Sequence, residues 1–359
     1  MKMLNPPLYF SYLVKHYLKN LLMILLGFSL AISVIDFLQQ MQKLESLGGY
    51  QLYYIFYKWE ESLTTLYPLA IVIAMIMTKI MMVKNNNIVI FHAFGYTKRK
   101  LFMPFLFVAM LTYSLFTLLH TTEFSYAKDR AELLLANKYD DYRVKDLFFK
   151  YNDAFVYIKD LDPVHKKITD ITIFKMKGQK VSYTVHAPVA AFVGEEWDAE
   201  EVVLKRHIYK NGVLQRYEEE YKESMKTLQG YKPKIIESLY EGEGLNIIDA
   251  FHAWRLLLKQ SLNSEKIRAA LYDKVITPLF SIALLLILFF KLPYHARLVN
   301  MSMNVAVAIG SLIGVWGILF GLARIGYNGV LPPEFTSLLP ILLLAGYAGY
   351  LYIVDEKIL

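Results

Sequence analysis

The chain is organised around the stretch Lys84-Asn-Asn-Asn-Ile-Val-Ile-Phe-His-Ala-Phe-Gly-Tyr-Thr-Lys-Arg-Lys100, which separates two long apolar runs. Its apolar middle is too short to cross a bilayer, since a membrane-spanning helix needs roughly 20 apolar residues. Ile88, Phe91 and His92 recur at helical spacing and therefore share one face of a predicted short helix. Gly95 is typical of the residue that ends a helix. Basic residues at both ends indicate the cytoplasmic side of a membrane, where this helix either rests on the lipid or docks a cytosolic protein.

The composition is that of a protein with several membrane-spanning helices, because 55% of its 359 residues are hydrophobic. The absence of cysteine excludes disulfides, thiolate metal sites and cysteine nucleophiles. The formal net charge of +7 is unevenly distributed, since residues 122–266 are nearly neutral, with 23 basic and 24 acidic side chains. The surplus of cations belongs to the apolar remainder, where membrane topology accounts for it, and no nucleic-acid binding is expected.

Six apolar runs are long enough to span a bilayer. We expect them at about 20–38, 62–83, 101–120, 275–290, 301–323 and 335–354. The second is expected to be broken at Pro68, and residues 9–19 mix aromatic and basic side chains that predict an interfacial segment. Eleven lysines and arginines at the ends of the spans and in the short segments beside them, Lys79 included, fall on the side that holds both termini, and five fall on the other. Both termini are therefore expected in the cytoplasm and the large insert on the outer side.

The polar insert between the third and fourth runs predicts a β domain. Alternating segments fall at 154–159, 168–176, 181–193, 202–209 and 213–221. Asn211-Gly212 is typical of a two-residue hairpin, and these strands predict an antiparallel sandwich or open barrel. An amphipathic helix is expected at 246–262. The plan is therefore 1–121 with three spans and the short helix at 84–98, 122–262 with the β domain, and 263–359 with three more spans.

No pattern in the sequence predicts catalysis. The eight histidines lack the spacing of metal ligands, and the chain has no Gly-x-x-x-x-Gly-Lys-Ser/Thr motif for nucleotide phosphates. We therefore expect neither a metal nor a cofactor. Lys43, Lys274 and Arg324 lie at the outer ends of predicted spans, where they either reach to lipid headgroups or bind the phosphates of a particular anionic lipid.

A stripe of glycines marks the fifth apolar run. Its members are spaced four, three and four residues apart, so they share one side of a helix: Gly310, Gly314, Gly317 and Gly321. Such a stripe lets a neighbouring helix approach closely. The contact is either static packing or an interface that moves.

This layout and several motifs resemble the LptF/LptG family, the permeases of the lipopolysaccharide-export ABC transporter. The resemblance covers nearly the whole chain. Its motifs are Ile88-Val-Ile-Phe-His-Ala-Phe-Gly-Tyr-Thr-Lys98, Leu66-Tyr-Pro-Leu-Ala70 and Lys274 with Pro278. Phe155-Val-Tyr-Ile158 and Gly329-Val-Leu-Pro-Pro333 are similar to the LptG branch, which we favour, whereas His92 is similar to the LptF branch.

The resemblance implies a protein of the bacterial inner membrane with six transmembrane helices and a periplasmic β-jellyroll-like domain. It would pair with a second permease of this family around a central cavity. A cytosolic ATPase dimer (LptB-like) would bind and hydrolyse ATP, so the chain itself would be no enzyme. The stretch that contains Asn87, Ile88, Phe91, His92 and Gly95 would be the coupling helix on which the ATPase docks.

The resemblance also implies a route for the lipid. Lipopolysaccharide would enter sideways from the outer leaflet, past a gate beside the glycine stripe, and would pass to a periplasmic bridge (LptC/LptA-like). One residue departs from the family pattern: Asn87 stands where a glutamate usually pairs with an arginine of the ATPase, although an amide can still accept a hydrogen bond. The alternative from another class is a membrane-anchored scaffold or sensor whose outer domain binds a ligand and which has no ATPase partner.

Overall fold

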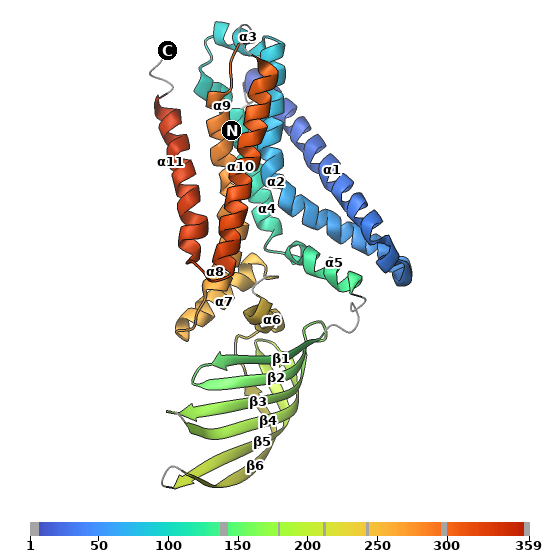
Figure 1. Cartoon of the computed structure of the whole chain (residues 1–359), viewed down its shortest axis with the longest axis vertical. Coiled ribbons are helices and arrows are strands. Elements are labelled where there is room, and N and C mark those ends of the chain that lie inside the picture. The colour runs from blue at the N-terminus through green and yellow to red at the C-terminus, as the bar shows by residue number, and fades with distance from the viewer. Residues whose placement is uncertain are drawn as a thin grey trace, which may run out of the picture. The chain divides into compact units, whose positions relative to one another are not determined.

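The computed structural model describes residues 7–136, 143–178, 180–210, 213–241, 244–295 and 300–354. The chain forms two compact units (Figure 1). The helical unit comprises Met1–Ala131 and Arg268–Leu359, and the β unit comprises Glu132–Ile267. Each unit therefore has its own buried core, and the β unit is an insertion in the sequence of the helical one.

Within the described residues, six helical segments are long and apolar enough to cross a membrane, which confirms the expected number of spans. They are α1 (Leu8–Leu44), α2 (Gln51–Lys84), α4 (Lys98–Leu119), α8 (Glu265–Val275) continued by α9 (Phe280–Lys291), α10 (Met301–Tyr327) and α11 (Leu339–Val354). Shorter elements join them: η1 (Glu45–Tyr50), α3 (Asn87–Ala93), η2 (Glu123–Tyr126), α5 (Ala127–Leu135), η3 (Thr277–Leu279) and the π-helical turn η4 (Glu334–Leu338).

Two spans are longer than the sequence pattern indicates. The segment 9–19, expected as a separate interfacial piece, is the start of α1, because no glycine or proline interrupts the helix before Gly27. Pro68, where a break was expected, lies inside the continuous helix α2. α2 changes direction along its length (Figure 1), as helices commonly do at a proline. The first two spans therefore form a long hairpin joined by η1.

α2 is the central helix of the helical unit. Its side chains Tyr67, Ile71 and Met75 are buried in the main apolar cluster of the unit. The hydroxyl of Tyr17 on α1 donates to the carbonyl of Ile71 at 2.8 Å, so the two helices are also joined by a buried hydrogen bond. α10 and α11 lie at the margin, and only 17% of the spanning window of each is buried. Most of their surface is therefore open to lipid or to another protein.

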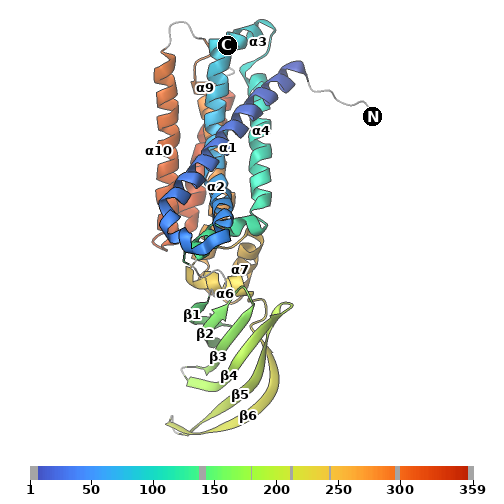
Figure 2. The same cartoon turned by 90° about the vertical axis from the view of Figure 1, so that its right-hand side faces the viewer.

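The β unit is one antiparallel sheet of six strands in the order β1-β2-β3-β4-β5-β6. The strands are β1 (Val144–Tyr151), β2 (Ala154–Asp162), β3 (Lys167–Lys177), β4 (Lys180–Val193), β5 (Glu196–Lys210) and β6 (Val213–Thr227). The antiparallel β domain is confirmed, although its strands form a single curved up-and-down sheet where a two-sheet sandwich was one alternative (Figure 2). The predicted hairpin turn Asn211-Gly212 lies outside the described residues, but Lys210 pairs with Val213 on either side of it.

The core of the β unit is built around two aromatic residues. The indole N–H of Trp197 on β5 donates to the carbonyl of Tyr231 at 2.6 Å, and both side chains are buried. The ring of Phe149 on β1 stacks on Tyr231 at 5.5 Å between centroids. Helices α6 (Pro233–Glu241) and α7 (Ile247–Lys259) complete the unit. β6 is mostly exposed, so the sheet ends in a long strand edge.

Candidate functional site

The organising stretch forms the short helix α3, as expected. Gly95, at a φ of 77°, follows the end of the helix. Its N–H donates to the carbonyl of His92, and the N–H of Tyr96 donates to the carbonyl of Phe91. This is a Schellman motif, in which glycine is favoured because other residues rarely adopt a positive φ. Gly95 is thus confirmed as the residue that ends the helix.

The face of α3 that carries Ile88, Phe91 and His92 packs against the helical unit. Ile88 is 1% exposed and belongs to the main apolar cluster, so it stabilises the fold and offers no surface to a partner. The ring of Phe91 lies 6.1 Å from the ring of Tyr96, and Nδ1 of His92 lies 2.9 Å from the carbonyl oxygen of Tyr96. The expectation that this face is turned to a partner is therefore wrong for Ile88, and Phe91 and His92 are only partly accessible.

The outer side of α3 is also apolar. Val89, Ile90 and Phe94 are 42%, 51% and 76% exposed. The sequence pattern singled out the other face, that of Ile88, Phe91 and His92. When a helix is apolar on all sides, its sequence does not show which face is covered. These three exposed apolar side chains, two on α3 and one on the residue that caps it, form a surface that suits a protein partner.

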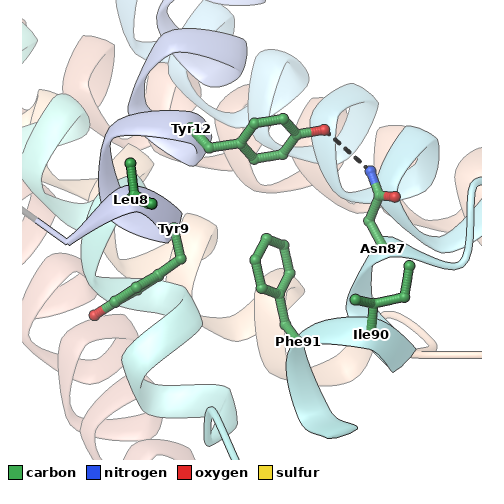
Figure 3. A pocket seen from close by; sticks show the side chains of 6 residues that line it. All are labelled: Leu8, Tyr9, Tyr12, Asn87, Ile90 and Phe91. Carbon is green, nitrogen blue, oxygen red and sulfur yellow. Dashed lines mark hydrogen bonds between the residues drawn. The ribbon is translucent and has the colours of Figure 1, made fainter. Parts of the chain in front are cut away.

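A pocket of about 250 Å³ lies between α3 and the first turns of α1 (Figure 3). Its walls come from two segments far apart in sequence: Leu8, Tyr9, Tyr12, Asn87, Ile90 and Phe91. The amide Nδ2 of Asn87 donates to the hydroxyl of Tyr12 at 3.1 Å, which fixes the start of α3 to α1. With mostly apolar walls and one amide, the pocket suits an apolar side chain of a partner better than a charged one.

Basic residues at the same end of the unit have defined contacts. The guanidinium Nε of Arg99 donates to the carbonyl of Tyr352 at 2.9 Å, near the end of α11. The ammonium of Lys98 lies 4.8 Å from the centroid of the Tyr294 ring. These cations therefore help to hold the helices together at this end.

The three cations expected to bind lipid lie at the end of the helical unit opposite to α3, on α1, α8 and α10 (Figures 1 and 2). Lys43 is exposed in the last turn of α1. The ammonium of Lys274 donates to the hydroxyl of Ser125, and the guanidinium of Arg324 lies 5.2 Å from the ring of Phe320. The structure thus places the three at one end of the unit, but on different helices.

A buried histidine lies beside Lys274. His120 is buried next to the ring of Phe124, and its Nδ1 donates to the carbonyl of Phe116 at 2.6 Å. Burial lowers the pKa of His120 to about 4, and the charge of Lys274 acts in the same direction, while the hydrogen bond to Phe116 opposes both. His120 is therefore neutral at neutral pH, and Lys274 supplies the positive charge.

The glycine stripe of α10 does not pack within this chain. A Cβ atom added at Gly310, Gly314, Gly317 or Gly321 would meet no atom within 4 Å. Within the described residues no helix approaches the stripe closely, so the expected close helix neighbour stays a prediction. Gly326, outside the stripe, makes the close approach: a Cβ there would lie 2.3 Å from Oγ1 of Thr336 on η4.

The family model described as "Lipopolysaccharide export system permease LptF/LptG" matches residues 11–354, nearly the whole chain. No curated protein sequence gives a significant match.

Proposed function

The chain belongs to the LptF/LptG family of lipopolysaccharide export permeases, and we propose that it is one of two permease subunits of an ABC transporter in the bacterial inner membrane. The transporter extracts lipopolysaccharide from the outer leaflet and passes it to a periplasmic bridge. Both termini lie in the cytoplasm, and the β unit lies in the periplasm. The observation that carries the proposal is the match over residues 11–354, which includes α3, the glycine stripe and the β unit.

α3 is the proposed docking site for the ATPase subunits, which bind and hydrolyse ATP. The contact surface we propose differs from the one expected from the sequence. It consists of Val89, Ile90 and Phe94, with the pocket beside Asn87 receiving an apolar side chain. Asn87 contributes through its side-chain oxygen, which can accept a hydrogen bond from an arginine of the ATPase while its Nδ2 donates to Tyr12. Phe91 is partly buried and forms part of the pocket wall behind this surface.

The second permease is proposed to cover α10. Its glycine stripe is exposed, and close helix contact is the usual role of such a stripe in membranes. The neighbour that the sequence pattern calls for is then supplied by another chain, and the gate for lipid entry lies between the two. Assignment to the LptG branch of the family stays a prediction.

Lipid recognition is proposed at the opposite end of the helical unit. Lys43, Lys274 and Arg324 supply positive charge at the level of outer-leaflet headgroups, where phosphates of lipopolysaccharide are recognised. The exposed edge of β6 offers unpaired backbone groups for the next component of the bridge. No step of this route requires chemistry by the permease itself.

The test is copurification of the ATPase with a tagged chain from membranes. Phe94→Asp and Ile90→Asp place a carboxylate in the proposed contact, and burying an unpaired charge there is expected to abolish recovery of the ATPase. Val164→Asp, at an equally exposed apolar residue of the β unit, is the matched control and should change nothing. A chain that never copurifies with an ATPase, in its natural form, would favour the scaffold or sensor alternative.

A further inference from the structure

A buried lysine joins α2 to the C-terminal end of α9, at the α3 end of the helical unit. Lys79, on α2, is 1% exposed. Its ammonium donates to the carbonyl of Leu292 at 2.7 Å and to the carbonyl of Phe289, both at the C-terminal end of α9. The last carbonyls of a helix have no partners within the helix and carry partial negative charge, so a cation there satisfies both needs.

Tyr294, just after α9, completes this arrangement. The ammonium of Lys79 lies 3.8 Å from the centroid of the Tyr294 ring, and that of Lys98 lies 4.8 Å from it. The hydroxyl of Tyr294 donates to the carbonyl of Phe289 at 3.1 Å. The ring of His92 on α3 lies 6.0 Å from the same ring. Tyr294 therefore touches α2, α3 and the first turn of α4 at once.

These contacts are hard to break one at a time. A buried ammonium that left the carbonyls would lose the groups that replace its water, and the carbonyl of Leu292 would lose this donor. The segments held by Lys79 and Tyr294 are thus expected to stay together when any one of them is displaced. α3 is joined to α2 by only two residues, so it shares this constraint.

We propose that Lys79 and Tyr294 are positioning residues that make α2, α3 and the C-terminal end of α9 move as one body. The inference rests on the proposed function in one respect: the ATPase is what displaces α3. Through this body a displacement of α3 reaches the end of α9 and also α10, which packs against α2. The lipid gate and the docking helix are then connected at the cytoplasmic end of the unit, without a path along the β unit.

The test measures this connection without ATPase or lipid. Because the chain has no cysteine, Ile90→Cys on α3 and Lys291→Cys at the end of α9 provide two unique sites for spin labels. The distance distribution between the labels, measured in liposomes, should be single and narrow. Lys79→Met and Tyr294→Leu are expected to add a second population of distances. Lys79→Arg keeps the positive charge and the hydrogen-bond donors, so this variant should show the single population of distances of the natural chain.

The matched control is Lys84→Met, an exposed lysine at the end of the same helix. It should leave the distribution unchanged. In the assembled transporter, lipid exported per ATP should fall about 2- to 30-fold in Lys79→Met with the ATPase still bound, the range observed when residues between two coupled sites are changed. If Lys79→Met fails to fold, Tyr294→Leu decides the question.

Unchanged distance distributions in the folded Lys79→Met or Tyr294→Leu variants would overturn the inference. That outcome is distinct from failure of the proposed function, which would appear as absence of the ATPase from the purified natural chain. Suppose that these variants change the label distances but the natural chain binds no ATPase. Lys79 and Tyr294 would then still hold α2, α3 and the end of α9 together, and only the role of the ATPase in displacing α3 would be refuted.

Discussion

Gly326 offers a quantitative test of the packing between α10 and the π-helical turn η4. In Gly326→Ala the new Cβ would lie 2.3 Å from Oγ1 and 3.4 Å from Cβ of Thr336, and Thr336 is itself 1% exposed. Ordinary contacts begin near 3.4 Å, so the overlap with Oγ1 is about 1 Å. Overpacking of this kind destabilises the fold by about 1–3 kcal/mol. The higher helix propensity of alanine relative to glycine stabilises it by up to about 1 kcal/mol.

The net expectation is that Gly326→Ala lowers the free energy of unfolding by about 1–2 kcal/mol. The assay is unfolding of the purified chain in detergent micelles. Gly317→Ala is the matched control, because it changes the same helix at a position with no atom within 4 Å and should leave stability equal or slightly higher. Thr336→Ala should remove most of the loss in the double variant, since it deletes the atom that clashes.

Two results would refute the reasoning. One is a Gly326→Ala chain as stable as Gly317→Ala. The other is a loss that Thr336→Ala does not relieve, because the strain would then lie elsewhere than in the contact between α10 and η4.

Three further predictions concern the rest of the helical unit. Gly317→Leu should leave the isolated chain folded, because the stripe is open, but should impair lipid export by the assembled transporter; normal export would remove the stripe from the gate. Photo-crosslinkers at Lys43, Lys274 and Arg324 should capture lipopolysaccharide in cells, and labelling no stronger than on the far sides of the same helices would contradict the lipid site. Because folded His120 stays neutral down to about pH 4 while the unfolded residue takes a proton near 6.5, the free energy of unfolding should fall as pH decreases through this range. The fall should be about 1.5 kcal/mol between pH 6.5 and 5, and His120→Gln should abolish it in unfolding curves measured at both pH values.

The membrane plan was predictable because each span is a long apolar run. Most strands were predictable because apolar and polar residues alternate along them. β1 was missed, since Leu147, Phe148 and Phe149 form a continuous apolar run although Phe148 is exposed. Alternation alone cannot identify such a strand, and its assignment depends on pairing with β2, where Phe148 faces Tyr157.

The candidate site was predictable in position but not in orientation. The pattern showed that Ile88 and Phe91 share a face of α3, yet which face is covered depends on Tyr9 and Tyr12, which approach from α1. Contacts between residues so distant in sequence leave no periodic signal. For the same reason Lys79 was counted only as a basic residue of the cytoplasmic side, although it is buried against α9.

The charges on α1 fix how a bilayer fits around it. Between Lys19 and Asp36 lie 16 residues without charge, about 24 Å of helix against a hydrocarbon thickness of roughly 30 Å. Lys19 can extend its ammonium beyond this stretch, but Asp36 is held by the hydroxyl of Tyr54 and lies 3.8 Å from Lys58. The mismatch therefore falls on the leaflet at the Asp36 end, which must thin beside α1 by a few ångströms. Lipids next to this helix are compressed before they meet any binding residue.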